Sequence, residues 1–542
     1  GNIGVAASPV NPDTVYVMRT GDRQIYKSIN AGATWTNTTT TFPNGSSNYN
    51  WSQSWYDWYL RCSSRPTASG NDDVLYAGLI DIVQSVDGGA SWRSIGGGKN
   101  SSGVWQAAYT NSAIVHQDNH DVAVDPNNPN RILVGTDGGV YLLTFNDGTS
   151  STQTDDTITY GNLNRRLGVT QFYRISQHPT NRNYVKGGTQ DNSTPHSFGN
   201  LADWANIGAG DGAGNAINPF NINQQYNSSQ GQNIYATTNG YGSQTTIASG
   251  GSTFTGQSSI PFIGLLRLDP NNGQYLYANT SSLNRFNRAT GTWTLQLGGR
   301  ALDTSSINSI AIAPGNSNRI LVGGDGRIEM STDFGVSFAR IDRQGQANGL
   351  PNRVVTEIAF HPTNQQDVVV TLSSSGTQHV YRCTNIDAAT PVWTPVGNGL
   401  PDIPANSIVR HPDDPNNTWY VAMDVGVWMT KNGGATWTDI TTPRGLPRVR
   451  VDELVINGVT RQLTAGTFGR GMWQLEIEPY ILNTLSAVPN PVVGGNTSVA
   501  TLTLKRPAPT GGLVVNLADN SPLISVPATV TVAAGATSAN FN

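Results

Sequence analysis

Ser28-Ile-Asn30-Ala-Gly32-Ala-Thr-Trp35 is the stretch that decides the fold, because related stretches return three more times along the chain. The other copies are Ser85-Val-Asp87-Gly-Gly89-Ala-Ser-Trp92, Ser331-Thr-Asp333-Phe-Gly335-Val-Ser-Phe338 and Thr430-Lys-Asn432-Gly-Gly434-Ala-Thr-Trp437. An Asp or Asn side chain can accept hydrogen bonds from the backbone of a tight hairpin, and glycine permits a positive φ. We therefore expect these residues to build turns, and Asp87 and Asp333 are not catalytic candidates.

The repeated turn belongs to a longer unit. A strand, a proline turn and a second strand precede it, as in Val122-Ala-Val-Asp125-Pro126. The aromatic residue of each unit recurs at intervals of roughly 45 to 57 residues or about twice that, at Trp35, Trp92, Trp204, Trp293, Phe338, Trp393 and Trp437. The double intervals place degenerate units around Val140–Leu163 and Gly214–Gly251. About ten units of four short strands are typical of the blades of a β-propeller.

The four turns resemble the Asp-box of bacterial neuraminidase repeats, which also occurs in sialidases, sortilin-type receptors and xyloglucanases. The resemblance implies an all-β, multi-bladed propeller over residues 1–479. Ten units fit one large ring like that of sortilin or an incomplete pair of rings like those of xyloglucanases. We favour one ring, because the chain is too short for two rings of seven blades. The last unit has three strands, so closure requires a strand upstream of Gly1 or contact between inner strands alone.

The composition changes after Pro479, where the repeated turns end and alternating strands follow. Alternation at period two predicts a β-sandwich over residues 480–542. The phrase from Val526 to Phe541 resembles the Calx-β/immunoglobulin-like modules of bacterial surface proteins, and it stops in mid-strand at Asn542. The resemblance implies a truncated module in a longer chain that is secreted or attached to a bacterial cell surface.

The charge content excludes several classes of partner. Only 13% of the 542 residues are charged and the net charge is −4, so we expect no nucleic-acid partner. No stretch of about 18 apolar residues is present, so we expect no membrane span. Cys62 and Cys383, the only two cysteines, make neither a disulfide framework nor a zinc pattern.

A group of histidines and acids is a candidate metal site. His116-Gln-Asp118-Asn-His120 is followed by Asp137-Gly-Gly, by Gln190-Asp191-Asn192 and by Gly210-Asp211-Gly212. This order resembles a group of poorly characterised bacterial repeat propellers, and it implies no reaction. On an extended strand, His116, Asp118 and His120 share one face and could hold a divalent cation. A buried, hydrogen-bonded cluster without metal is the alternative, and we assign no cofactor beyond this possible cation.

An aromatic-rich insertion is the candidate ligand surface. It runs from Tyr49 to Tyr59 and contains Trp51, Trp55, Tyr56, Trp58 and Tyr59. Flat aromatic rings stack on sugar faces, although packing against a neighbouring blade would use the same residues.

These features favour a binding or structural propeller for polysaccharide or a surface protein. The alternative is a xyloglucanase-like inverting glycoside hydrolase acting on β-glucans, with Asp191 and Asp211 as its two carboxylates. A sialidase does not fit, because Tyr173-Arg174-Ile175-Ser176 lacks the proline of the family's F/Y-R-I-P phrase and follows two copies of the turn.

Overall fold

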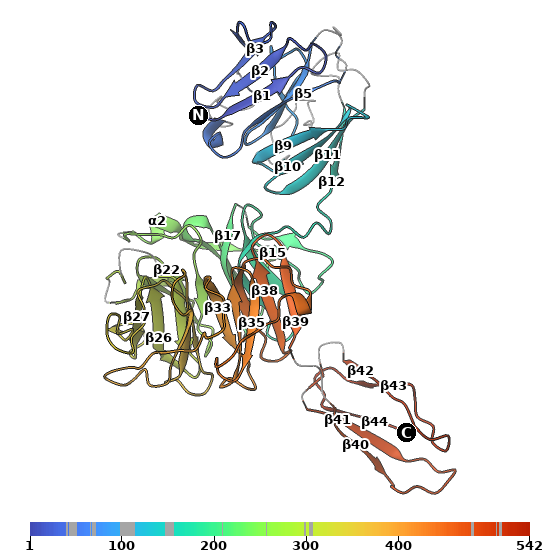
Figure 1. Ribbon diagram of the computed structural model, residues 1–542. Helices are drawn as coiled ribbons and strands as arrows, with labels where there is room; N and C mark the ends of the chain where they lie inside the picture. Colours follow the sequence, from blue (N-terminus) through green and yellow to red (C-terminus); the bar gives the residue numbers. More distant parts are fainter. Residues whose placement is uncertain are drawn as a thin grey trace. The chain divides into compact units, whose positions relative to one another are not determined.

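The computed structural model describes residues 1–38, 42, 51–65, 67, 72–97, 114–146, 157–208, 210–255, 257–297, 300–302, 307–477, 482–505, 507–508 and 512–542. The chain forms two compact units, Gly1–Val169 and Thr170–Asn542 (Figure 1). The division at 169/170 falls inside the range 1–479 that the repeat predicts as one propeller. The predicted boundary at 479/480 lies outside the described residues.

The first unit contains three four-stranded antiparallel sheets, each of which is one blade. Their strands are β1 (Ile3–Ala7), β2 (Val15–Arg19), β3 (Gln24–Ser28) and β4 (Thr36–Asn37); β5 (Tyr59–Ser63), β6 (Val74–Gly78), β7 (Ile82–Ser85) and β8 (Arg93–Ser94); and β9 (Asn119–Val124), β10 (Arg131–Thr136), β11 (Gly139–Phe145) and β12 (Ile158–Asn162). A 3-10 turn, η1 (Trp51–Gln53), precedes the second blade.

The second unit begins with seven sheets, of which six have four strands and the last has three. Their strands are β13 (Phe172–Gln177), β14 (Val185–Thr189), β15 (Pro195–His196), β16 (Ala205–Asn206); β17 (Gly212–Ile217), β18 (Gln225–Ser229), β19 (Asn233–Thr237), β20 (Thr245–Ser249); β21 (Leu266–Leu268), β22 (Tyr275–Asn279), β23 (Leu283–Asn287), β24 (Thr292–Leu295); β25 (Ser309–Ala313), β26 (Asn316–Gly324), β27 (Arg327–Ser331), β28 (Ala339–Arg340); β29 (Val355–Phe360), β30 (Val368–Leu372), β31 (Val380–Cys383), β32 (Thr394–Pro395); β33 (Ala405–Arg410), β34 (Thr418–Met423), β35 (Gly426–Lys431), β36 (Thr438–Asp439); and β37 (Val451–Ile456), β38 (Gln462–Thr467), β39 (Met472–Glu476). Short helical turns η2 (Gln230–Gln232), α2 (Gly250–Thr253) and η4 (Thr442–Arg444) lie between them.

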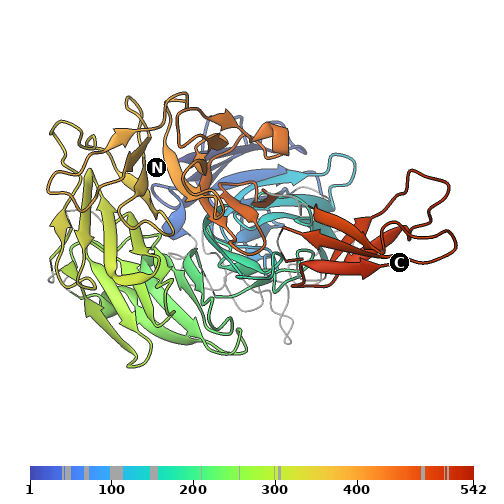
Figure 2. The same ribbon diagram turned by 90° about the horizontal axis from the view of Figure 1, so that it is seen from below.

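These seven sheets close into a ring (Figures 1 and 2). The last blade packs against the first, since β37 and β38 both contact β13. At this seam a side chain at Gly466 of β38 would meet Ile175 of β13, and Thr464 donates a hydrogen bond to Gln177 at 2.8 Å. Closure therefore uses inner strands, which is one of the two routes that the sequence leaves open.

The structure confirms a multi-bladed propeller. The single ring of about ten blades that we favour from the sequence is wrong. Nine four-stranded sheets and one three-stranded sheet account for the predicted count of about ten units. They do not form one ring, because seven blades close among themselves and the other three belong to the separate unit Gly1–Val169. The last blade has three strands among the described residues, as predicted.

A small β-sandwich follows the ring in sequence. One sheet pairs β40 (Leu482–Val488), β41 (Val499–Leu504) and β44 (Ser538–Phe541), and the other pairs β42 (Leu513–Asn516) with β43 (Thr529–Val532). Leu502, Leu504, Val530 and Val532 form a core shared by both sheets. The alternating pattern predicts four of these strands, and β40 is the one that it misses.

The repeated turn has the same hydrogen bonds in all four predicted copies. At Ser331, the hydroxyl accepts from the Gly335 N–H at 2.8 Å and donates to Asp333. Asp333 in turn accepts from the Ser337 N–H at 2.9 Å. The corresponding bonds recur from Ser28, Ser85 and Thr430. The acid or amide of the pattern is therefore occupied in holding its own turn.

A fifth copy, which the sequence search misses, begins at Thr237. Thr237 donates to Asn239, and it accepts from the Tyr241 N–H at 3.0 Å. Asn239 accepts from the Ser243 N–H at 2.9 Å. Tyr241 stands where the other copies have glycine and holds the same left-handed backbone, with φ of 74°. The missing glycine and the missing terminal aromatic hide this copy, which lies in the predicted degenerate unit Gly214–Gly251.

At three blades of the ring, the recurring aromatic residue joins the blade to the one before it. Trp293 donates from its indole N–H to the Ile247 carbonyl at 2.7 Å, Trp393 to Ile341 at 2.9 Å, and Trp437 to Val396 at 2.8 Å. Each acceptor lies in the outermost strand of the preceding blade or directly after it. In the first unit, the Tyr160 hydroxyl makes the equivalent bond to the Ile95 carbonyl at 2.8 Å. We call this contact the blade latch.

Three aromatic residues of the repeat make no blade latch with a described residue, and one of them, Phe338, has no N–H or O–H to donate. Trp204 lies in the first blade of the ring, next to the blade that has no fourth strand among the described residues, and it bonds to Leu201 of its own loop. Trp35 lies in the first blade of the first unit, and its side chain is 42% exposed. The latch therefore forms only where a four-stranded blade precedes.

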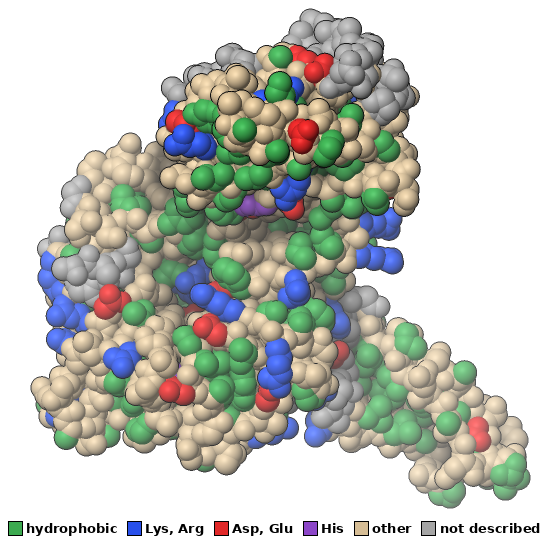
Figure 3. Space-filling model, turned by 45° about the horizontal axis from the view of Figure 1, so that its top comes forward, with side chains coloured by type: hydrophobic (Ala, Val, Ile, Leu, Met, Phe, Trp, Pro, Cys, Tyr) green, Lys and Arg blue, Asp and Glu red, His purple; other side chains and the backbone are tan. Residues whose placement is uncertain are grey.

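The surface has few charges. Figure 3 shows scattered basic and acidic side chains on a face made mostly of other polar residues and backbone, in agreement with the low charge content of the sequence. Both cysteines are free thiols. None of the described helices is long and apolar enough to cross a membrane.

The latch predicts an asymmetry between two tryptophans. Trp437→Phe removes the indole donor and leaves the Val396 carbonyl without it, so we expect the free energy of unfolding to fall by about 1–3 kcal/mol. Trp204→Phe, which breaks no bond between blades, should cost less than about 0.5 kcal/mol. Differential scanning calorimetry of the two variants measures the difference, and equal losses would contradict a role for the latch.

Candidate functional site

The aromatic insertion divides into buried and exposed residues. Trp51 is buried and stacks on Phe42, with ring centroids 5.4 Å apart. Tyr59 is buried on β5, and Trp58 packs against the same core as Trp51. Trp55 and Tyr56, by contrast, are 75% and 44% exposed. Of the predicted ligand residues, these two present rings to solvent, whereas Tyr49 lies outside the described residues.

Tyr56 is part of a polar cluster in the first unit. Its hydroxyl donates to both oxygens of Asp137, at 3.2 and 3.1 Å. The Nε2 of His120 lies 2.6 Å from Asp137 Oδ1, and the His120 ring meets the Tyr56 ring edge-on at 4.9 Å. Asp137 lies in the turn between β10 and β11, so this turn, β9 and the aromatic insertion meet at one point.

The three predicted metal ligands are not arranged as one face of a strand. Strand β9 begins only at Asn119, and Asp118 has a positive φ of 59°, so the expected alternation does not reach His116. The His116 Nδ1 faces the Gln117 carbonyl at 3.0 Å, whereas Asp118 accepts from Gln53 at 2.7 Å. Within the described part of the chain, His116, Asp118 and His120 form no group of ligand atoms within 4.8 Å of one another.

The glycines of the Asp137-Gly-Gly phrase serve packing. A side chain at Gly138 would collide with His116, whose Cβ would lie 2.3 Å from the added carbon. Asn164 donates to the Gly138 carbonyl at 2.9 Å and accepts from the Val140 N–H at 2.7 Å. The phrase therefore fixes the turn that carries Asp137.

Asp57 belongs to this cluster, and the sequence analysis does not select it. It lies between η1 and β5 and is fully buried, and its carboxyl group lies against that of Asp118. Burial raises the pKa of Asp57 to about 8, with a further contribution from the negative charge of Asp118. The one signal in the sequence is an acid inside an otherwise aromatic run.

The predicted catalytic pair lies in the second unit, and its two carboxylates are close together. The Nε2 of Gln190 donates to Asp191 Oδ1 at 2.9 Å and to Asp211 Oδ1 at 2.6 Å, so these oxygens are at most about 5.5 Å apart. Asp211 Oδ1 also accepts from the Asp191 N–H at 2.9 Å. Glycine lets these loops interlock, since a side chain at Gly212 would meet the Ser193 carbonyl at 1.9 Å.

A pocket of about 280 Å³ opens in the ring beside this pair. It lies at the start of β13, β29, β33 and β37, at one mouth of the ring. Its polar lining consists of Tyr173, Arg174, Asn308, Asn406, Arg450 and Asp452. The Tyr173 hydroxyl donates to Gln190, which joins the pocket to Asp191 and Asp211. We call it the mouth pocket.

The charges of the mouth pocket are only partly paired. Arg450 pairs with Asp452 at 2.7 Å and lies 3.7 Å from Asp424. No described residue makes a hydrogen bond or an ion pair with the guanidinium of Arg174. Burial raises the pKa of Asp452 to about 6, and burial together with the charge of Asp211 raises the pKa of Tyr173 to about 12.

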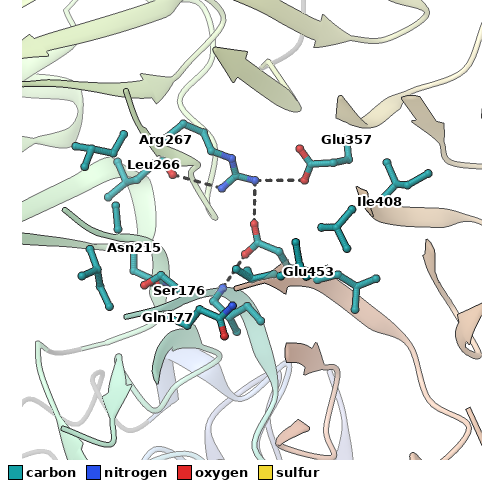
Figure 4. Close-up of a pocket in the computed structure, with 16 residues that line it drawn as sticks. Ser176, Gln177, Asn215, Leu266, Arg267, Glu357, Ile408 and Glu453 are labelled. Atoms are coloured by element: carbon teal, nitrogen blue, oxygen red, sulfur yellow. Dashed lines mark hydrogen bonds and ion pairs between the residues drawn. The ribbon is translucent and has the colours of Figure 1, made fainter. Parts of the chain in front are cut away.

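A second cavity of about 400 Å³ lies in the channel of the ring (Figure 4). Arg267 points toward two carboxylates there and donates to Glu453 at 2.8 Å and to Glu357 at 3.3 Å. Glu453 also accepts from the Ile175 N–H at 2.7 Å, so β13, β21, β29 and β37 are tied together. Burial raises the pKa of Glu357 against the opposing effect of Arg267. These charges hold the blades together, and the mouth pocket is the better candidate for a ligand.

Comparisons with known proteins identify no relative by sequence. No family model matches the chain, and no curated protein matches it. Among solved structures, YCF48 from Cyanidioschyzon merolae aligns over 57% of this chain and 95% of its own, with 9% identity and a TM-score of 0.43. The computationally designed Ika8 protein aligns over 65% of this chain and 94% of its own, with 11% identity and a TM-score of 0.39.

The buried carboxyl group of the mouth pocket predicts a pH dependence. The pKa of Asp452 is above the ordinary value of about 3.9, so its contribution to stability is present below about pH 4 and is lost as the pH rises through about 6. Asp452→Asn keeps the neutral form at every pH. We expect the variant to gain up to about 2 kcal/mol relative to the wild type between pH 5 and pH 7.5. Thermal unfolding at the two pH values measures this gain, and a constant difference would contradict it.

Proposed function

We propose that this chain is the binding part of a secreted or cell-surface protein and that the mouth pocket takes a polysaccharide ligand. The observation that carries the proposal is the unpaired Arg174 in a concave pocket with two asparagine amides and the Asp452 carboxyl group. A few polar groups that converge in a preformed pocket are typical of a ligand site.

The chemistry of the pocket favours a ligand rich in hydroxyl groups. Sugar hydroxyls both donate and accept hydrogen bonds, so they match guanidinium, amide and carboxylate groups in one place. Tyr173 adds an aromatic ring at the rim. The net charge of −4 disfavours a polyanion such as nucleic acid. Five copies of the repeated turn support membership of the Asp-box propellers, some of which bind or cleave polysaccharides.

Arg174→Met tests the pocket directly. It removes the unpaired donor and keeps the length of the side chain, so we expect the affinity for the bound polysaccharide to fall at least about tenfold, or 1.4 kcal/mol. Isothermal titration with xyloglucan and other β-glucan oligosaccharides measures the affinity. Arg288→Met, at an exposed turn after β23, is the matched control.

Two outcomes would count against this proposal. Either no polysaccharide of the panel binds, or Arg174→Met binds as tightly as the wild type. A protein ligand of the same pocket would give the first outcome, and its affinity would still fall in Arg174→Met.

The hydrolase alternative has a specific geometric difficulty. An inverting glycosidase separates its two carboxyl groups by about 6.5–9.5 Å to admit a water molecule. Asp191 and Asp211 instead share the amide of Gln190, with oxygens at most about 5.5 Å apart. Asp211 also uses its carboxylate to hold the loop of Asp191. The spacing and these bonds support a positioning role for Asp211.

We therefore expect no release of reducing ends from β-glucans by the purified protein. Asp191→Asn and Asp211→Asn should leave that background unchanged, and Asp211→Asn should instead weaken binding at the mouth pocket by loosening the loop. A reducing-end assay on the three proteins makes the comparison. Cleavage that either substitution abolishes would restore the hydrolase.

A further inference from the structure

The first unit contains three blades, and each of its two end blades has a free face. The second strand of a blade is the best marker, because neighbouring blades cover both of its faces. In the middle blade β6 is buried at every position, and so are β14, β30 and β38 of the ring. In the end blades, buried residues of β2 and of β10 alternate with half-buried or exposed ones. Among the described residues, the first and third blades therefore lack a neighbour on one side.

Both free faces are apolar. On the first blade, Ile3 and Val5 of β1 are exposed, and Val17 of β2 lies opposite Val5 in the register. On the third blade, Leu133 of β10 and Leu163, which follows β12, are exposed. Apolar side chains at alternate positions of a strand are typical of a face that another surface covers. Each free face therefore has the composition of a blade interface.

The free face of the third blade is hollowed. It carries a cavity of about 410 Å³ whose apolar lining includes Ala123, Leu133 and Leu142. These three residues lie side by side in the register of β9, β10 and β11. The free face of the first blade presents the larger side chains of Ile3 and Val5, which suit such a hollow.

Neighbouring blades of this unit meet in one way. The first strand of a blade packs on the first two strands of the blade before it, since β5 contacts β1 and β2, and β9 contacts β5 and β6. By the same rule, β1 is the strand that would pack on the first two strands of a blade placed before it. The third blade offers two such strands, β9 and β10. The two free faces are therefore the two halves of one blade interface.

The blade latch is also incomplete at both ends of the unit. Trp35 of the first blade is exposed, and no described residue accepts a hydrogen bond from its indole N–H. The latch acceptors Ile95, Ile341 and Val396 each donate their own N–H to the third strand of their blade. Leu163 donates its N–H to β11 in the same way, so its carbonyl holds the acceptor position of the third blade. No described residue donates to that carbonyl.

We propose that the first units of two chains associate head to tail into one six-bladed ring. The third blade of each copy receives β1 of the other, and Trp35 of each copy donates to the Leu163 carbonyl of the other. An interface between two different surfaces closes when the copies complete a circle. Propellers typically have about four to eight blades, a range that two copies of three blades reach and that one or three copies miss. The proposal does not rest on the ligand of the mouth pocket.

The mass of the 542-residue chain in solution is the first test. Sedimentation velocity over a range of micromolar concentrations distinguishes one chain of 57.7 kDa from two. We expect a dimer that dissociates on dilution. Trp35→Phe removes only the indole donor between the copies, so it should weaken the dimer about three- to tenfold.

Substitutions on the two free faces locate the contact. Val5→Asp and Leu133→Asp each place a charge where the copies meet, so each should weaken the dimer at least about tenfold. Both side chains are exposed in a single copy, so both variants are expected to fold, which circular dichroism checks. Leu523→Asp changes an exposed apolar residue of the β-sandwich and should dimerise as the wild type does.

A mixture of Val5→Asp and Leu133→Asp tests the head-to-tail arrangement. In a mixed dimer, one interface joins the unsubstituted Leu133 to the unsubstituted Val5, and both substitutions lie in the other interface. We therefore expect the mixture to regain dimer at a concentration where each variant alone is monomeric. A contact between two like faces would not give this rescue.

Three results would overturn the proposal. The first is a chain that is monomeric at every concentration, which would assign the free faces to another occupant, such as further blades of a longer chain. The second is a dimer that Val5→Asp and Leu133→Asp both leave unchanged. The third is a mixture of these two variants that regains no dimer.

Discussion

The propeller depends on the packing of each blade against its neighbours, and at four blades this contact includes a hydrogen bond from an aromatic side chain to the blade before it. A single four-stranded sheet cannot bury both of its faces, so each blade needs its neighbours. The indole or phenol at the end of the repeat buries a large ring between two blades and fixes their spacing through a polar tip. Because the donor belongs to one blade and the acceptor to another, the hydrogen bond fixes the position of one sheet relative to the next. Trp204, which follows a blade with no fourth strand among the described residues, keeps its ring partly exposed.

The same constraint explains why a sequence rich in acids and aromatics offers so few functional residues. Asp333 and Asn432 hold turns, and Trp393 and Trp437 join blades. The glycine–acid phrases behave similarly, since their glycines allow one loop to lie directly on another. Function must therefore be sought in groups that the architecture leaves unsatisfied, such as the guanidinium of Arg174.

The sequence predicts the blades well and their assembly less well. The number of units follows from the spacing of one aromatic residue, because this residue recurs at a similar place in most blades. Ring closure depends on which blades contact each other far apart in the sequence. The contact between β37 and β13 closes the ring, and no local sequence pattern predicts it. The hydrogen bonds of the turn require only side-chain oxygens and one residue with a left-handed backbone. At the copy that begins at Thr237, Tyr241 and not glycine has this backbone, so the sequence pattern misses the copy. The candidate site is harder still. The metal triad assumes a strand through His116, but β9 begins at Asn119.

The buried ionisable groups differ in how the fold offsets their loss of water. Lys186, fully buried in the ring, donates to the Tyr226 carbonyl at 3.0 Å and to the Tyr241 hydroxyl at 2.8 Å. Arg267 is held between two glutamates, and Glu453 also accepts a backbone N–H. Each of these groups has partners that offset the loss of water. Asp57 is as deeply buried, and its carboxyl group lies against that of Asp118. Burial and the negative charge of Asp118 raise the pKa of Asp57 to about 8, so this group is mostly neutral at pH 7 and its burial does not leave an unpaired charge.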